Sequence, residues 1–240
     1  MNPFSLWLAL GVTLGLWQVA HTGPPRERFV HLGLGVVVLL AALAGARLGY
    51  VLLHLGPFRA QPGLVPQVWQ GGLTWVGALP GALLGLGGLA WGLRRPFLGL
   101  AERLLPLLPA VGAAAWLGCW GAGCAYGAPA SPATWWALPV VDELGQSNWR
   151  WPLQPLAALT LLGGFGLLEA FLREAPPARR VGWGGLWFAA HTALFSLGRA
   201  DVPPAWHGQR LDLPLCLILG ASCTGLLVST YLSRGRKAVR

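Results

Sequence analysis

One arginine lies within an otherwise apolar stretch of the chain, in the sequence G-A-R-L-G-Y-V at residues 45–51. A guanidinium surrounded by hydrocarbon is unfavourable by several kcal/mol unless it pairs, lines a wet cavity or reaches the interface. Its planar set of N–H donors suits a phosphate group, so Arg47 is a candidate for binding an anionic lipid headgroup. The alternative is a side chain that extends to the membrane surface beside Tyr50 and His54.

A second group of polar residues follows another apolar run. Arg199 and Asp201 are separated by one residue, and His191 lies about two helical turns earlier. An arginine beside an acid could bind a phosphate and orient a thiol or hydroxyl, or it could be a surface ion pair of little consequence. Neutral imidazole accepts a proton near neutral pH, so His191 is a candidate general base. The alternative for His191 is a hydrogen-bonded residue of the helix core.

Two glycine-rich stretches lie near the ends of apolar runs, at residues 71–81 and 118–127. Glycine lets a backbone or a lipid headgroup approach closely, although the same residues are typical of plain helix packing. The second stretch contains Cys119 and Cys124, whose spacing is not typical of a zinc site. We interpret them as two small apolar residues, with a disulfide across a distorted turn as the alternative.

The composition of the 240 residues excludes a soluble globular protein, because 55% are hydrophobic and only 10% are charged. An ordinary soluble domain carries about 25% charged residues. Intrinsic disorder is excluded as well, since 14 tryptophans and 8 phenylalanines are too apolar for a solvated coil. The formal charge of +9 does not indicate nucleic-acid binding, because the basic residues lie between apolar runs, where they orient membrane proteins.

Seven apolar segments can be marked along the chain, each of roughly the length that a bilayer requires. Backbone polar groups in hydrocarbon must be satisfied within their own segment, so each segment is predicted to be a helix. The predicted fold is therefore all-α, a single polytopic membrane domain over residues 1–240 with about seven transmembrane helices. The predicted segments are residues 4–20, 29–53, 73–93, 104–120, 153–172, 181–197 and 213–232.

Basic residues alternate between the two sides of these predicted spans. They are few in the loops after even-numbered spans and frequent in the other loops and near the C-terminus. The positive-inside rule then places the N-terminus outside and the C-terminus in the cytoplasm. Residues 56–72, 121–150 and 198–212 are consequently expected on the outer face. The basic residues of these three segments are Arg59, Arg150, Arg199 and Arg210.

Taken in order, these motifs resemble the bacterial prolipoprotein diacylglyceryl transferases. The resemblance covers nearly the whole chain, with matching span number and orientation. It rests on residues 45–51, W-Q-G-G-L-T-W-V-G at residues 69–77, residues 118–127, P-L-Q at residues 152–154, and residues 185–201.

The resemblance implies that a diacylglyceryl group passes from phosphatidylglycerol to the lipobox cysteine of a preprolipoprotein, with formation of a thioether and release of glycerol phosphate. It implies a bacterial inner-membrane enzyme whose partners are phosphatidylglycerol, the preprolipoprotein signal peptide and the bilayer. No metal, cofactor or nucleic acid is expected. The residues expected to bind phosphate or lipid are Arg47, Arg199, Gly72, Gly77, Gly123 and Gly127, and the expected catalytic residues are His191 and Asp201.

The family carries polar or charged side chains at several positions where this chain does not. These positions are Val76, Trp116, Cys119, Cys124, Ala157 and, in the sixth span, Thr192 or Phe195. An alternative function is therefore that of a catalytically degenerate member, which binds lipid or a membrane partner without transfer. A small transporter or channel has little support, because no charged path crosses the spans and no inverted repeat is visible.

Overall fold

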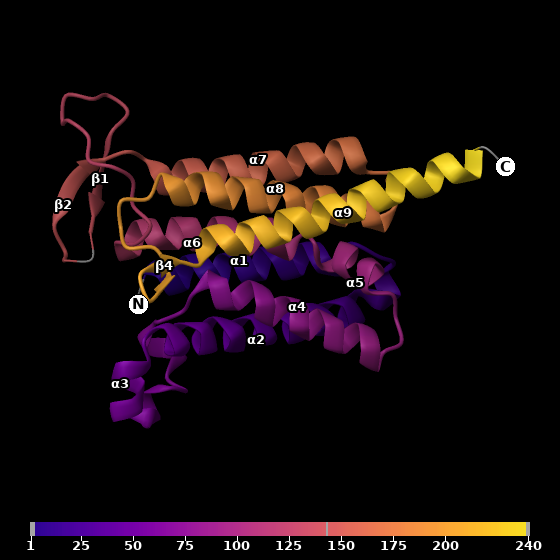
Figure 1. The fold of residues 1–240 in the computed structure, drawn as a ribbon, viewed down its shortest axis with the longest axis horizontal. Helices are drawn as coiled ribbons and strands as arrows, with labels where there is room; N and C mark the ends of the chain where they lie inside the picture. Colours follow the sequence, from indigo (N-terminus) through magenta and orange to yellow (C-terminus); the bar gives the residue numbers. More distant parts are fainter. Residues whose placement is uncertain (1–2, 143, 239–240) are drawn as a thin grey trace.

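The structure, a computed structural model, describes residues 3–142 and 144–238 and consists mainly of long helices (Figure 1). Each of the seven apolar segments forms helix, so the predicted helical architecture is confirmed. The long helices are α1 (Pro3–Ala20), α2 (Arg28–Leu53), α4 (Trp75–Gly92), α6 (Leu107–Ala122), α7 (Leu153–Leu172), α8 (Pro177–Leu197) and α9 (Asp212–Ala238).

Shorter elements lie at the ends of the long helices. Strands β1 (Leu138–Val141) and β2 (Ser147–Arg150) pair in an antiparallel hairpin, with Leu138 opposite Arg150. Strands β3 (Ala205–Trp206) and β4 (Gln209–Arg210) form a second, smaller pair. The hairpin, β4 and the short helix α3 (Leu55–Ala60) lie at one end of the bundle, and α5 (Phe97–Leu104) lies at the other (Figure 1). Among the described residues, three single 3-10 turns occur, at Pro25–Glu27, Pro62–Leu64 and Val68–Gln70.

Fewer helices than the seven predicted meet a test of length and hydropathy for crossing a membrane. Within the described residues, five helices are long and apolar enough to cross a membrane. The number rises to six if α5 and α6, which are joined at a bend, form one span. Helix α8 has 21 residues but is not among them, because its arginines, His191 and several glycines make it less apolar. The chain is thus a multi-pass helical membrane protein, whereas seven spans and the orientation of the termini stay predictions.

The fourth predicted segment, residues 104–120, corresponds closely to α6, and the short helix α5 precedes it. Helix α5 ends at Leu104, α6 begins at Leu107, and their axes differ by 45°. Pro106 lies at the break, and its missing N–H together with the bulk of its ring interrupts the helical hydrogen bonds. Pro80, by contrast, is accommodated within α4, as proline often is in membrane helices.

Apolar side chains lie both between the helices and on their outer surfaces. The bundle exposes many large ones, such as Leu84 at 77% and Ile218 at 65%, which is the distribution expected of helices that face lipid. Inside, one buried cluster joins α1, α2 and α4 to α5 and the start of α6. Its members are Val19, Val38, Leu86, Leu100, Leu104 and Leu107.

Helices α2 and α4 approach each other closely through glycines spaced four residues apart, which are Gly45 and Gly49 on α2 and Gly77 and Gly81 on α4. A methyl group on Gly81 would lie 2.5 Å from the carbonyl oxygen of Ala41. Small residues at this spacing let membrane helices pack backbone against backbone. Gly77, which the sequence analysis expected to contact phosphate or lipid, therefore lies in a helix–helix contact.

Replacing Gly81 by alanine is expected to lower the free energy of unfolding by about 1–3 kcal/mol, because the added methyl group overlaps the α2 backbone. The matched control is Gly88→Ala on the same helix, where a Cβ would meet nothing within 4 Å. Both changes raise helix propensity equally, so loss of the helical circular dichroism signal on heating isolates the packing effect. Equal midpoints for the two variants would contradict the close contact.

Candidate functional site

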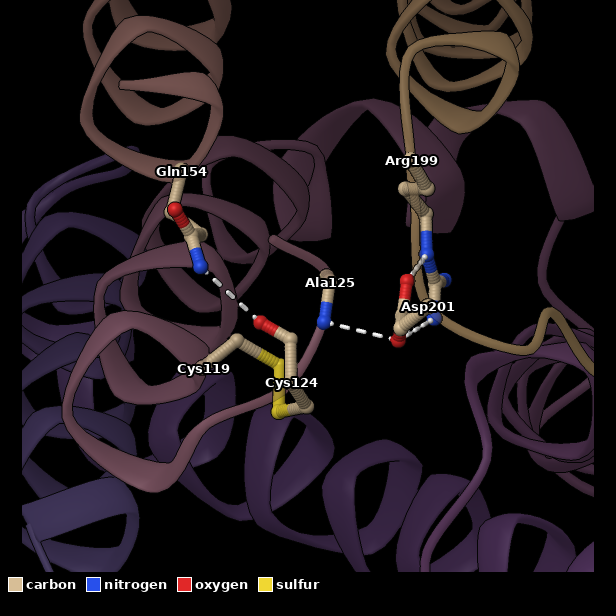
Figure 2. The surroundings of a disulfide bond; sticks show 6 residues. All are labelled: Cys119, Cys124, Ala125, Gln154, Arg199 and Asp201. Atoms are coloured by element: carbon tan, nitrogen blue, oxygen red, sulfur yellow. Dashed lines mark hydrogen bonds and ion pairs between the residues drawn. A yellow bond between two sulfur atoms is a disulfide. The ribbon is translucent and has the colours of Figure 1, made fainter. Parts of the chain in front are cut away.

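Three segments of the chain meet at the end of the bundle that carries the hairpin (Figures 1 and 2). They are the loop that follows α6, the start of α7, and the segment that follows α8. This meeting brings Gly127 beside Arg199 and Asp201, which lie far from it in the chain. Gly123 lies at the start of the same loop.

The first segment begins where α6 ends. Gly123 has a left-handed backbone, with φ of 71°, and its N–H donates to the carbonyl of Cys119. Glycine favours this helix-ending conformation because it has no Cβ. The reversal brings Cys124 beside Cys119, with Cα atoms 4.6 Å apart, and the two form a disulfide. The interpretation of two small apolar residues was wrong, because the helix ends before Cys124 and ideal helical spacing no longer separates the side chains.

The third segment presents a two-point ion pair. The Nε of Arg199 donates to Oδ1 of Asp201 over 2.8 Å, and Nη2 donates to Oδ2 over 2.7 Å. Both side chains are nearly buried, at 13% and 11% exposure, so this is not the freely solvated surface pair of the alternative interpretation. The Oδ2 atom also accepts a hydrogen bond from the N–H of Ala125 over 2.9 Å (Figure 2). Asp201 therefore ties the guanidinium to the loop after α6.

Backbone contacts extend this connection. The N–H of Ala200 donates to the carbonyl of Tyr126 over 2.8 Å, and Gly127 pairs with Arg199 in an antiparallel β-bridge. A Cβ on Gly127 would lie 2.7 Å from the carbonyl oxygen of Trp151. The backbone of Gly127 lies close to those of Trp151 and Arg199, so a side chain would not fit at this position. This explains the glycine without a ligand.

The start of α7 supplies a buried amide and, just before it, a buried arginine. Gln154 is completely buried, and its Nε2 donates to the carbonyl of Cys124 over 3.0 Å. Arg150 stacks on the ring of Tyr126, with Cζ 4.0 Å from the ring centroid, and its Nη2 lies 3.5 Å from Oδ2 of Asp142. These contacts hold both sides of the loop, because cation–π stacking and buried hydrogen bonds are each lost if the loop shifts.

Arg47 belongs to a different part of the same end. Only 6% exposed, it donates to four backbone carbonyls of the segment between α3 and α4. Nε bonds Val65 over 2.8 Å, Nη2 bonds Leu64 over 2.5 Å, and Nη1 bonds Gly71 and Gly72 over 2.7 and 3.1 Å. A guanidinium has five N–H groups, so Arg47 neither reaches the surface nor presents a free face to a phosphate in this conformation.

His191 lies within the bundle. It is 3% exposed, its Nε2 is 3.0 Å from the hydroxyl of Thr160, and its ring stacks on Phe195 with centroids 4.5 Å apart. The ring of Phe195 in turn meets that of Trp116, at a centroid distance of 6.0 Å. Within the described residues, no hydrogen bond connects His191 to Arg199 or Asp201, so the structure does not bring the two candidate catalytic groups together.

A second arginine–aspartate pair escaped the sequence analysis. Nη2 of Arg210 donates to Oδ2 of Asp212 over 2.7 Å and to the carbonyl of Ser196 over 3.0 Å. Asp212 is completely buried, and its hydrogen bond raises the pKa of the Arg210 guanidinium, which keeps the pair charged. The signal was the spacing, because Arg-x-Asp occurs at both 199–201 and 210–212. No group of three or more metal-binding side chains occurs within the described residues.

The fold and this end of the bundle define a multi-pass membrane protein whose loops hold arginines in fixed ion pairs. A model of the family "Prolipoprotein diacylglyceryl transferase" matches residues 1–232. The "Phosphatidylglycerol--prolipoprotein diacylglyceryl transferase" of Gluconobacter oxydans (strain 621H) is 33% identical over 206 residues, which are 79% of this chain and 72% of that protein. The protein of the same name from Burkholderia mallei (strain SAVP1) is 33% identical over 101 residues, 42% of this chain and 34% of that protein. The chain therefore belongs to the prolipoprotein diacylglyceryl transferase family, which confirms the resemblance found in the sequence.

Replacing Arg47 by methionine is expected to free the segment between α3 and α4, because four carbonyls lose a charged donor. Since one such hydrogen bond contributes about 1.5–3 kcal/mol, protease cleavage within residues 61–72 should accelerate at least about tenfold. Arg59→Met, an exposed arginine of α3, is the control. Unchanged cleavage of the Arg47 variant would show that the arginine does not hold this segment.

Proposed function

We propose that this chain transfers the diacylglyceryl group of phosphatidylglycerol to the lipobox cysteine of a preprolipoprotein. It acts as a single integral domain of the bacterial inner membrane, with its N-terminus outside and its C-terminus in the cytoplasm. The observation that carries the proposal is the Arg199–Asp201 pair held against the loop after α6. The family of the chain and the name of its relatives support the same reaction.

Arg199 is the phosphate-binding group of this proposal. Asp201 engages Nε and Nη2, and within the described residues Nη1 makes no hydrogen bond. The carboxylate therefore orients the guanidinium while leaving donors for an anion, and a preoriented cation stabilises developing negative charge without reorganisation. Arg47 could take part only after its loop carbonyls release it, so we assign it first to the support of residues 64–72.

The proposed reaction is a substitution at carbon. The sulfur of the lipobox cysteine forms a bond to the glyceryl carbon, and the bond from that carbon to the phosphate oxygen breaks. Glycerol phosphate leaves with the electron pair, which Arg199 stabilises, and the thiol proton passes to a base. Asp201 and His191 are the proposed bases. Asp201 lies beside Arg199, whereas His191 would need a path through the bundle interior.

Lipid binding without transfer is the second candidate function. The observation that favours it is the contact between Trp116 and Phe195. The family resemblance leads us to expect a polar group at position 116 and another at either Thr192 or Phe195. An aromatic pair excludes water and supplies no cation to a leaving phosphate. The two candidates differ in one measurable product, glycerol phosphate.

Purified full-length protein, given phosphatidylglycerol vesicles and a lipobox peptide, is expected to release glycerol phosphate and yield a peptide heavier by one diacylglyceryl group. Arg199→Gln should reduce kcat/KM about a hundredfold or more, because a positioned donor to the leaving group is lost. Arg59→Gln, an exposed arginine outside the proposed site, should retain the wild-type rate.

The product assay also separates the two candidates. Vesicle binding that depends on Arg199, in a protein that releases no glycerol phosphate above background, would replace transfer by lipid binding. Equal rates for the Arg199 variant and the wild type would remove Arg199 from the site.

A further inference from the structure

The disulfide between Cys119 and Cys124 is connected to the Arg199–Asp201 pair through only one residue. Cys124 is bonded to Cys119 through its side chain and to Gln154 through its carbonyl. The next residue, Ala125, donates its N–H to Oδ2 of Asp201. Figure 2 shows these contacts in sequence, from the end of α6 to the guanidinium of Arg199.

Ala125 needs such anchors because its own backbone does not favour the observed conformation. Its φ is +51°, in the left-handed region that a residue with a Cβ rarely adopts, and its side chain is buried. Such a conformation persists only where the surroundings impose it. On the N-terminal side the disulfide and Gln154 fix Cys124, and on the C-terminal side the bridge between Gly127 and Arg199 fixes the strand direction.

The disulfide closes a short loop, with a sequence separation of only 5. A short loop restrains the unfolded chain less than a long one, so general stabilisation of the bundle is the smaller part of its effect. The larger effect is local, because the covalent bond sets where the amide of Ala125 points.

We propose that the Cys119–Cys124 disulfide is a positioning element for Arg199, which it orients through the amide of Ala125 and the carboxylate of Asp201. The role of Arg199 as the phosphate-binding group rests on the proposed function, whereas the coupling between the disulfide and the ion pair does not. Neither cysteine touches the reacting atoms in this assignment. The family resemblance leads us to expect polar side chains at positions 119 and 124. In this chain the two residues instead form a disulfide, which makes the loop backbone rigid.

The test uses full-length protein in nanodiscs that contain phosphatidylglycerol, in three forms. These are the oxidised wild type, the wild type measured after reduction with a phosphine and again after reoxidation, and the double variant Cys119→Ala with Cys124→Ala. The control is Cys216→Ala with Cys223→Ala, which removes the two buried free thiols of α9 and leaves the disulfide intact.

The first readout is amide hydrogen exchange, which is independent of catalysis. Loss of the disulfide should accelerate exchange at the amides of Ala125 and Ala200, which bond Asp201 and Tyr126, while the amides of α2 and α4 stay protected. The second readout is kinetic. Misplacement of Arg199 should lower kcat/KM about tenfold to a hundredfold, with recovery on reoxidation and wild-type values in the α9 control.

The outcomes separate the inference from the function on which it rests. Local acceleration at both amides with a reversible loss of kcat/KM supports the inference. Local acceleration in a protein that never transfers supports the coupling and rejects the proposed function. Unchanged exchange at Ala125 and Ala200 after reduction overturns the inference. Faster hydrogen exchange throughout the bundle also overturns it, because the disulfide would then stabilise the whole fold and not this loop in particular.

Discussion

Asp201 joins two parts of the chain, because its carboxylate accepts hydrogen bonds both from Arg199 and from the amide of Ala125, 76 residues away. A carboxylate accepts several hydrogen bonds at once, and those from charged donors are about twice as strong as neutral ones. The pair lies at 11–13% exposure, where an unmatched charge would be strongly unfavourable. The position of the loop after α6, and with it the candidate site, therefore depends on this side chain together with the disulfide and Gln154.

The arginines at this end of the bundle differ in how their charge is compensated, and the difference decides what each can do. Arg199 and Arg210 each use one edge on an aspartate two residues along the chain. Arg150 combines an aspartate with the face of Tyr126. Arg47 uses four carbonyls and so is engaged on nearly all of its donors. A guanidinium held by one edge still offers donors to an anion, whereas one enclosed by carbonyls supports a loop.

The continuous apolar segments predicted the helices well, because hydrocarbon leaves a backbone no alternative to internal hydrogen bonds. They did not predict the short helix α5, which a break at Pro106 divides from α6. At Cys119 and Cys124 the geometry of a continuous helix was the wrong reference, since Gly123 ends the helix between them. For His191 the sequence left a general base and a hydrogen-bonded core residue as alternatives. Its burial and its contact with Thr160 show an interior position.

The sequence alone determined the class of protein, its helical segments and its family, because hydropathy and short motifs are local properties. It also marked Arg199 and Asp201 as candidates for the site. The tertiary structure decided which of these residues meet. It gave Arg47 and Arg199 different partners and placed Gly77 in the contact between α4 and α2. It also joined the end of α6 to the segment after α8 through Ala125. Such pairings depend on how distant segments pack in space, and no local pattern of residues encodes the partner of a guanidinium.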